Sequence, residues 1–361
     1  MRVMIFAGGA GRRLWPISRE SSPKQFEPIV ADGSTIQMAV ERVAPTYGFD
    51  NIYVATNERY VDIVRQQLPQ LPSGNILAEP ARRDLGPAVG LAMAHLARQD
   101  AESPVAILWS DNYIENVPAF TELLGAAERL LRSGVADILF IGETPRFANE
   151  NLGWIGLGER AGRVGDLPYY CFRSLTYRPT LERCREMFAQ GRHVWNTGFF
   201  VTTPAYVRDL YRRHSPQMWQ QLSAIEAAIA TEQYDETLRS VYPAIQPVNF
   251  DDAILTHVDT ERAMVLHSEM GWSDPGTLYA LKEALDPDPA ANVTKGLVID
   301  TASRDSLLYN YEPHKLLVAV GLEGMIVVNT DDAILVVHKD QIPLVKKVIS
   351  DLKGTELESY S

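Results

Sequence analysis

The first 142 residues alternate between two hydrophobic periods, and this alternation constrains the fold more than any other feature of the chain. Short apolar runs bounded by turn residues predict strands at 3–7, 52–55, 76–78, 105–109 and 138–141. Apolar residues three or four positions apart predict intervening helices around 36–43, 61–68, 89–96 and 120–131. The sequence therefore predicts an α/β fold with a doubly wound, mostly parallel sheet, whose ligands bind beyond the carboxyl ends of the strands.

The pattern becomes less regular after residue 142. Residues 143–195 predict an antiparallel insertion with glycines at its turns. The expected elements that follow are a strand at 195–202, helices around 205–213 and 218–230, a strand at 263–267 and a helix at 276–285. The sheet of the first 142 residues is thus expected to continue through this region.

A stiff linker, Asp286-Pro287-Asp288-Pro289, predicts a domain boundary. We expect a catalytic domain over residues 1–286 and a small domain over residues 290–361. Short apolar runs recur about every ten residues beyond the linker, without helices between them, and a helix is expected at 342–352. This rhythm predicts a small all-β domain, either a sandwich or a short left-handed β-helix.

The net charge and the number of cysteines exclude several classes of function. The 361 residues carry 34 Lys and Arg against 46 Asp and Glu, a net charge of −12, so neither nucleic acid nor an anionic membrane is an expected partner. An anionic substrate must be held by a local cluster of cations and backbone amides. Two cysteines, Cys171 and Cys184, are too few for a disulfide framework, and the N-terminus does not have the pattern of a signal peptide. A cytoplasmic protein is therefore expected.

The first predicted strand runs into a glycine-rich loop followed by cations. Gly8, Gly9 and Gly11 would let the backbone approach an anion closely, and Arg12, Arg13 and Lys24 follow. The sequence does not match the dinucleotide-binding fingerprint, because Leu14 stands where the last glycine of that motif belongs. It does not match a Walker loop either, because Arg13 stands where the second glycine of that motif belongs. The remaining alternatives are a tight turn with solvated arginines and a phosphate-binding loop. The preceding strand and the three cations favour phosphate binding.

The loop and the residues after it resemble a known family. Ala7-Gly8-Gly9-x-Gly11-x-Arg13-Leu14-Trp15-Pro16-x-Ser18-Arg19, with Pro23-Lys24-Gln25-Phe26, is similar to the opening signature of the sugar-nucleotide pyrophosphorylases. Leu-Trp-Pro-x-Ser-Arg is the variant typical of mannose-1-phosphate guanylyltransferases. Further matches are Glu79-Pro80 with Arg83, Ser110-Asp111, residues 195–199, Phe250-Asp251 and residues 271–274. The resemblance covers nearly the whole chain and implies a Rossmann-like nucleotidyltransferase fold.

Two aspartates are candidate metal ligands. Asp111 follows a predicted strand, and Asp274 stands at the start of a predicted helix. Read separately, Asp111 would be a turn residue and Asp274 a helix N-cap. The family resemblance implies instead that both bind one Mg²⁺, which accepts one or two carboxylates together with phosphate oxygens and water.

The resemblance also implies the reaction and the site. Mannose 1-phosphate would attack the α-phosphate of GTP and give GDP-mannose and pyrophosphate, in a protein expected to be a homodimer. The implied catalytic residues are Arg13, Lys24, Asp111 and Asp274. The implied nucleotide-binding residues are Ala7, Gly8, Gly9, Gly11, Arg12, Arg13, Glu79, Pro80 and Arg83. The implied sugar-binding residues are Asn112, Gly153, Tyr177, Arg178, Asn196, Thr197, Gly198 and Asp251.

Several positions depart from the family pattern. Asn112 replaces a histidine, Tyr177-Arg178 replaces Glu-Lys, and Thr256 replaces a carboxylate. The loss of a glutamate at position 177 removes a hydroxyl ligand from the sugar site. These departures keep two alternatives open: the same chemistry on another sugar 1-phosphate or nucleotide, and a weakly catalytic paralogue that binds a nucleotide sugar and regulates a partner.

Overall fold

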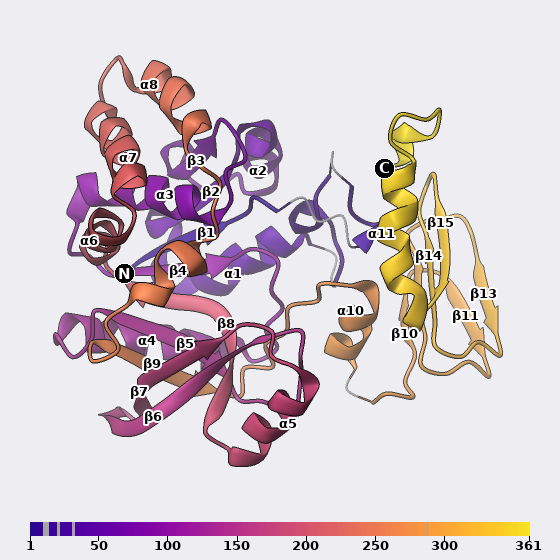
Figure 1. The fold of residues 1–361 in the computed structure, drawn as a ribbon. Helices are drawn as coiled ribbons and strands as arrows, with labels where there is room; N and C mark the ends of the chain where they lie inside the picture. The colour runs from indigo at the N-terminus through magenta and orange to yellow at the C-terminus, as the bar shows by residue number, and fades with distance from the viewer. Residues whose placement is uncertain (10–13, 20–21, 31–32, 287) are drawn as a thin grey trace. The chain divides into compact units, whose positions relative to one another are not determined.

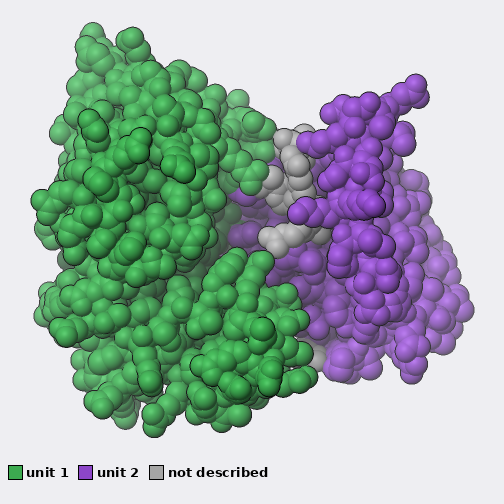
Figure 2. Space-filling view, in the orientation of Figure 1, with its two compact units in different colours: residues 1–8, 39–110, 114–272 green, residues 9–38, 111–113, 273–361 purple. Residues whose placement is uncertain are grey.

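Two compact units make up the protein. The computed structural model describes residues 1–9, 14–19, 22–30, 33–286 and 288–361. Unit 1 comprises residues 1–8, 39–110 and 114–272, and unit 2 comprises residues 9–38, 111–113 and 273–361 (Figure 2). Residues 9–38 thus group with the C-terminal part of the chain. No local pattern indicated this grouping, and the division into domains 1–286 and 290–361 stays a prediction.

The described residues of unit 1 form a nine-stranded sheet in the order β3-β2-β1-β4-β8-β5-β9-β7-β6 (Figure 1). The strands are β1 (Arg2–Phe6), β2 (Ile52–Asn57), β3 (Ile76–Glu79), β4 (Val105–Trp109), β5 (Ile138–Glu143), β6 (Gly153–Val164), β7 (Leu167–Thr176), β8 (His193–Thr202) and β9 (Ala263–Ser268). Strands β1 to β4 pair in parallel, and β5 pairs in parallel with β9. The prediction of an α/β fold with a mostly parallel sheet is confirmed.

Strand β8 departs from the simple alternation. It lies between β4 and β5 and is antiparallel to both. Strand β6 pairs with β8 as well as with β7, and β7 pairs with β9. The five strands β8, β5, β9, β7 and β6 therefore close into a ring at one side of the sheet.

The helices that accompany this sheet are α1 (Thr35–Tyr47), α2 (Val61–Gln67), α3 (Leu85–Asp100), α4 (Val117–Arg132), α5 (Leu181–Gln190), α6 (Pro204–His214), α7 (Pro216–Ala228), α8 (Tyr234–Val241) and α9 (Phe250–Ala253). Helices α1 to α4, α6 and α7 lie at the predicted positions, and α5, α8 and α9 are additional. Helix α8 was not predicted, although Tyr234, Leu238 and Val241 recur at helical spacing and pack in the core of unit 1. No helix in the described part of the chain is both long and apolar enough to cross a membrane.

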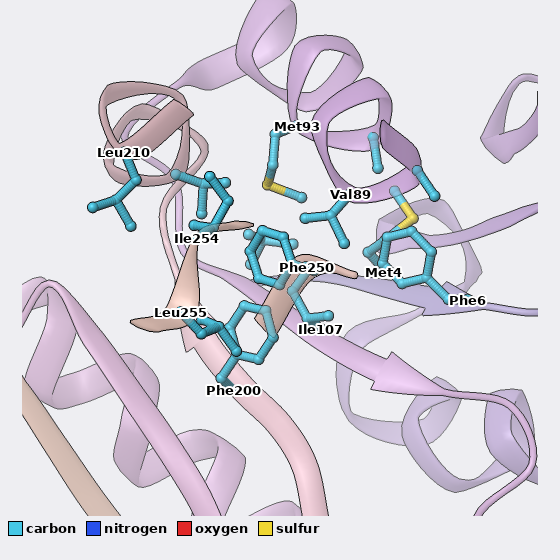
Figure 3. Packing of buried hydrophobic residues seen from close by; sticks show 14 of the residues in the cluster. Met4, Phe6, Val89, Met93, Ile107, Phe200, Leu210, Phe250, Ile254 and Leu255 are labelled. Carbon is cyan, nitrogen blue, oxygen red and sulfur yellow. The ribbon is translucent and has the colours of Figure 1, made fainter. Parts of the chain in front are cut away.

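The core of unit 1 lies where helix α3 covers the sheet. Val89 and Met93 of α3 belong to the same buried cluster as Met4 of β1 and Ile107 of β4 (Figure 3). The rings of Phe200 and Phe250 stack within this cluster at 5.7 Å between centroids. Apolar residues at helical spacing on α3 thus face apolar residues of the parallel strands, as the sequence period predicts.

Unit 2 contains the short strands of the C-terminal region. They are β10 (Val293–Lys295), β11 (Val298–Thr301), β12 (Leu307–Asn310), β13 (Leu317–Val320), β14 (Met325–Asn329) and β15 (Ile334–His338), accompanied by α10 (Leu278–Leu285) and α11 (Ile342–Asp351). β10, β12 and β14 form one parallel ladder, and β11 and β13 form another. Strands β10 to β14 alternate between the two ladders, which is the arrangement of a short β-helix, and β15 pairs antiparallel with β14.

The N-terminal segment supplies part of the core of unit 2. Leu14, Ile17 and Ile29 belong to one buried cluster with Leu307 and Tyr309 of β12. The Nζ atom of Lys295 and the hydroxyl of Tyr311 donate hydrogen bonds to the carbonyl oxygen of Pro28. The segment after the glycine-rich loop is therefore packed on the β-helical strands.

Candidate active site

Lys24 and two aspartates converge in unit 2. Lys24 begins the 3₁₀ turn η2 (Lys24–Phe26) and is buried. Its Nζ atom lies 3.3 Å from Asp111 Oδ2 and 3.7 Å from Asp274 Oδ1, and it donates a hydrogen bond of 3.0 Å to the Pro275 carbonyl. Three residues that are far apart in the sequence thus meet around one ammonium nitrogen.

A short antiparallel bridge brings the two aspartates together. The N–H of Tyr113 donates to the carbonyl of Ser273, and the N–H of Ser273 donates to the carbonyl of Tyr113, both at 3.0 Å. Asp111 lies two residues before one end of this bridge, and Asp274 lies one residue after the other. The pairing therefore holds the two carboxylates near each other.

Asp274 is not the N-cap of a helix. Helix α10 begins at Leu278, and the side chain of Thr277 caps it by accepting a hydrogen bond from the Ala280 N–H. The expectation of a helix beginning at residue 276, with Asp274 at its start, is wrong in this detail, because the turn Asp274–Gly276 precedes the cap. The carboxylate of Asp274 is left to face Lys24.

The two carboxylates fit a divalent cation. The side chains of Asp111 and Asp274 are 40% and 43% exposed, so solvent and substrate oxygens can reach them. Two carboxylates are what Mg²⁺ commonly takes from a protein that binds it together with phosphate. Among the described residues, no group of three or more His, Cys, Asp or Glu side chains could hold a metal.

Asn112 lies in the same part of unit 2. It is buried and lines a small pocket together with Lys24, Asp111 and Pro275. The structure thus places one predicted sugar-binding residue beside the predicted catalytic lysine.

The start of the glycine-rich loop is described only in part. The N–H of Ala7 donates to Ala55, and the Thr56 hydroxyl donates to the Ala7 carbonyl at 2.9 Å, which fixes the end of β1. The Gly9 carbonyl accepts a hydrogen bond from the Gln25 side chain. The predicted phosphate-binding residues Gly11, Arg12 and Arg13 lie outside the described residues.

Glu79 borders this loop within unit 1. A side chain at Gly8 would lie 3.8 Å from Glu79 Oε1, so the two residues are neighbours. The hydroxyl of Tyr242 donates a hydrogen bond of 2.6 Å to Glu79 Oε2. Burial raises the pKa of the Glu79 carboxyl to about 7. Near neutral pH this carboxyl can therefore either accept or donate a hydrogen bond.

Pro80 and Arg83, the predicted nucleotide-binding residues that follow Glu79, differ in their surroundings. Pro80 is half-buried. The guanidinium of Arg83 donates a hydrogen bond to the Pro243 carbonyl. This contact holds Arg83 against the chain that follows helix α8.

Gly153 and Asn196 are paired in neighbouring strands of unit 1. They stand opposite each other where β6 meets β8. Asn196 Oδ1 accepts a hydrogen bond of 3.0 Å from the Gly198 N–H. Gly198 has φ of 76° and packs against the Trp109 indole, so no side chain fits there.

Thr197 has a different environment from its neighbours. Its side chain is buried, and its hydroxyl donates to the Ile141 carbonyl at 2.5 Å while accepting from the Phe199 N–H at 3.1 Å. The hydroxyl proton is therefore committed to the backbone. Thr197 supports the bend of β8 that presents Asn196.

The remaining predicted sugar residues are Tyr177, Arg178 and Asp251, and the first two directly follow Thr176, whose carbonyl oxygen would lie 3.8 Å from a side chain at Gly153. The side chain of Tyr177 is 67% exposed, and its ring stacks on the guanidinium of Arg178 at 5.2 Å. Asp251 is the second residue of helix α9, and burial raises the pKa of its carboxyl. The contribution of all three to a sugar site stays a prediction.

Sequence reasoning missed Glu143. This carboxylate ends β5, is buried, and accepts hydrogen bonds from the N–H groups of Met270 at 2.9 Å and Gly271 at 3.2 Å. The loop that it holds continues three residues later into Asp274. Burial raises the pKa of Glu143 to about 7. The signal was a glutamate closing an otherwise apolar strand, which resembles an ordinary turn residue.

The α/β sheet of unit 1, and the lysine with an acidic pair in unit 2, are features typical of enzymes that act on phosphate groups. The chain belongs to the nucleotidyl transferase family, whose model matches residues 2–289. A second model, described as a MannoseP isomerase/GMP-like beta-helix domain, matches residues 296–352. Enzymes of nucleotidyl transfer generally use a divalent metal.

Individual relatives extend the comparison. The alginate biosynthesis protein AlgA of Pseudomonas aeruginosa is 31% identical and is matched over 98% of this chain and 72% of that protein. The mannose-1-phosphate guanylyltransferase RfbM of Salmonella typhimurium is 29% identical over 99% of this chain and 73% of that protein. A crystal structure from Thermus thermophilus, named a mannose-1-phosphate geranyltransferase, superimposes with a TM-score of 0.85 at 26% identity, covering 98% of this chain and 99% of that one.

Proposed function

We propose that this protein joins mannose 1-phosphate and GTP to give GDP-mannose and pyrophosphate. The observation that carries the proposal is the convergence of Lys24 with Asp111 and Asp274 in a member of the nucleotidyl transferase family. The names of relatives such as RfbM support guanine and mannose as the nucleotide base and the sugar.

The proposed reaction is an in-line displacement at phosphorus. A phosphate oxygen of mannose 1-phosphate forms a bond to the α-phosphorus of GTP, and the bond from that phosphorus to the bridging oxygen of the β-phosphate breaks. Pyrophosphate leaves with the electron pair. The attacking phosphate is already ionised near neutral pH, so the protein needs no general base and must instead offset the repulsion between anions.

Each residue of the site has a role in this proposal. Lys24 contacts the α-phosphate and the sugar phosphate, while Arg13 and the loop amides hold the β- and γ-phosphates. Asp111 and Asp274 would hold Mg²⁺, which when bound neutralises phosphate charge. Glu79 lies beside Gly8 and would face the base.

The sugar would be met mainly by Asn196 and Gly153, which lie opposite each other. Arg178 keeps a positive charge where the family pattern has lysine. Tyr177 stands where the family pattern has a glutamate, and its side chain is exposed, so it offers the sugar one hydroxyl and a ring in place of a carboxylate. Sugar selectivity is therefore the part of the proposal that most needs measurement.

The test is pyrophosphate release, screened over four nucleoside triphosphates and several sugar 1-phosphates. We expect GTP with mannose 1-phosphate to give the highest kcat/KM. A higher value with another pair would replace the proposed substrates while keeping the chemistry. No release with any pair, in the presence of Mg²⁺, would reject the enzymatic proposal.

A regulatory protein that binds a nucleotide sugar is the second candidate. It is favoured by the exposed Tyr177-Arg178 pair and by Thr256, whose hydroxyl donates to the Asp252 carbonyl at 3.1 Å. Such a protein would bind GDP-mannose tightly but turn over slowly. The same screen, combined with calorimetric binding of GDP-mannose, separates the two candidates.

We also propose a homodimer in the cytoplasm. Apolar side chains of unit 2 that stand more than half exposed, including Val320, Ile334 and Val336, support an association surface. The free thiols of Cys171 and Cys184 support a reducing compartment. Light scattering of the purified chain tests the dimer, and fractionation of the producing cells tests the location.

A further inference from the structure

A pocket of about 870 Å³ lies in the five-stranded ring of unit 1. Every strand of the ring contributes to it or borders it: Thr144 follows β5, Leu157 and Arg160 are on β6, Tyr170 and Arg173 on β7, His193 and Val194 on β8, and His267 on β9. Phe188 and Gly191, at the end of helix α5, complete its wall. A closed ring of paired strands gives this pocket a fixed frame.

The rim of this pocket is cationic. Three arginines line it, Arg160, Arg173 and Arg192, with Glu159 as the one carboxylate among the lining residues. No ion pair joins any of the three guanidinium groups to a carboxylate within the described residues. In a chain with a net charge of −12, this local gathering of unpaired cations favours an anion.

The floor of the pocket is apolar and aromatic. Leu157 and Val194 are buried, and the Tyr170 ring lies 5.5 Å from the His267 ring. The Thr144 hydroxyl shares a hydrogen bond of 3.2 Å with His267 Nδ1. Burial lowers the pKa of both His193 and His267, so both imidazoles are neutral near pH 7 and the arginines carry the positive charge.

The pocket is distinct from the candidate active site. None of the residues that line it is among those predicted to bind the nucleotide, the sugar or the metal. It also lies entirely within unit 1, whereas Lys24, Asp111 and Asp274 belong to unit 2.

We propose that this pocket is a second, non-catalytic binding site for a small phosphorylated metabolite of the nucleoside diphosphate class. Arg160, Arg173 and Arg192 would receive the phosphates, because a guanidinium contacts two phosphate oxygens at once. The base or another flat group would lie against Tyr170 and Phe188. A ligand held here contacts β5, β8 and β9 together and stabilises the ring.

Calorimetric titration with GDP tests the proposal. The test variant carries Arg160→Ala, Arg173→Ala and Arg192→Ala. The matched control carries Arg163→Ala, Arg183→Ala and Arg185→Ala, which remove the same charge from exposed positions of β6 and α5 outside the pocket. All six arginines are exposed, so both proteins should fold, and their melting temperatures check this.

We expect the number of GDP molecules bound per chain to be lower by one in the test variant than in the unchanged protein. The control variant should bind the same number as the unchanged protein. This difference is predicted whatever GDP does at the candidate active site, so failure of the proposed function leaves the test intact. Equal GDP stoichiometry in all three proteins would overturn the proposed site.

Two further probes identify the ligand class. Guanosine should not bind in the pocket, and inorganic pyrophosphate should bind at least about tenfold more weakly than GDP. If pyrophosphate binds there as tightly as GDP, the assignment to a nucleotide is wrong and the pocket takes free phosphate ions. If guanosine binds as tightly as GDP, the role of the arginines is wrong.

Discussion

Lys24 determines how two like charges can stand together at the candidate active site. Its buried ammonium lies 3.3 Å from the carboxylate of Asp111 and 3.7 Å from that of Asp274. Two carboxylates near each other repel, and a cation between them offsets this repulsion. The residue that the resemblance assigns to the substrate phosphates therefore also holds the acidic pair in place.

Asp111→Asn removes one charge from this pair without changing its size. We expect turnover to fall by about 100-fold or more, because one strong electrostatic contact to the transition state is lost. Steady-state kinetics at saturating Mg²⁺ measure the effect, with the exposed Asp166→Asn as the control. Turnover within a few fold of the unchanged protein would remove Asp111 from the mechanism.

Glu79→Gln changes how stability depends on pH. The folded-state pKa of about 7 lies above the ordinary value of 4.5, so between these pH values the folded protein retains a proton that the unfolded chain has released. This carboxyl therefore lowers the free energy of unfolding as pH rises through the window, by about 3 kcal/mol in total. In the Glu79→Gln variant this decrease in the free energy of unfolding with rising pH is absent.

Urea unfolding from pH 4.5 to pH 8 checks this prediction. The stability of Glu79→Gln relative to the unchanged protein should rise with pH across the window and then level off. The exposed Glu102→Gln serves as the control and should show no such trend. A flat difference for Glu79→Gln would contradict the raised pKa.

Among the secondary-structure elements, the end of β5 supports the loop that leads to Asp274. Glu143 accepts two backbone hydrogen bonds from this loop, at Met270 and Gly271. The bridge between Tyr113 and Ser273 then holds the following residues. A strand end, a loop and a two-residue bridge thus act in sequence to place one carboxylate.

Glu143→Gln should weaken this support. A carboxamide offers only one oxygen acceptor, so one of the two N–H groups loses its partner, at a cost of about 1–3 kcal/mol. We expect lower kcat with little change in KM for GTP, because Asp274 is displaced while the glycine-rich loop is not. The neighbouring exposed Glu269→Gln is the control, and an unchanged kcat in Glu143→Gln would show that the loop needs no such anchor.

Across the molecule as a whole, the C-terminal β-helical strands pack against the N-terminal segment that carries Lys24. Leu307 is fully buried in the cluster that contains Leu14, Ile17 and Ile29, and Lys24 lies between those residues in the sequence. The all-β region is therefore part of the unit that carries the lysine and the aspartates.

Leu307→Ala should thus affect both stability and activity. A buried leucine truncated to alanine costs about 2–5 kcal/mol. Chemical unfolding should show this loss, and limited proteolysis should cut residues 14–29 faster than in the unchanged protein. Val318→Ala, at a 54% exposed position of β13, should change stability by less than about 0.5 kcal/mol. Equal proteolysis of the two variants would argue against the packing.

Local sequence patterns were enough to predict the order and type of most elements. Apolar periods of two and 3.6 residues reflect burial on one strand face or one helix face, so they predicted β1 to β5 and α1 to α4. The glycine-rich opening was also readable from its local pattern, whereas the pairing of Asp111 with Asp274 was predicted only from the family resemblance. Helix α8 was missed although Tyr234, Leu238 and Val241 have helical spacing, because eight residues show this period only once.

Which elements are neighbours became known only from the folded chain. Strand β8 lies between β4 and β5, and β6 pairs with both β7 and β8, which no local pattern indicates. Lys24 reaches Asp111 and Asp274 across 87 and 250 residues of sequence, and residues 9–38 group with the C-terminal strands. Local patterns reflect how each segment buries its own apolar face, whereas pairing order and charge convergence depend on contacts between segments that the chain brings together only when it folds.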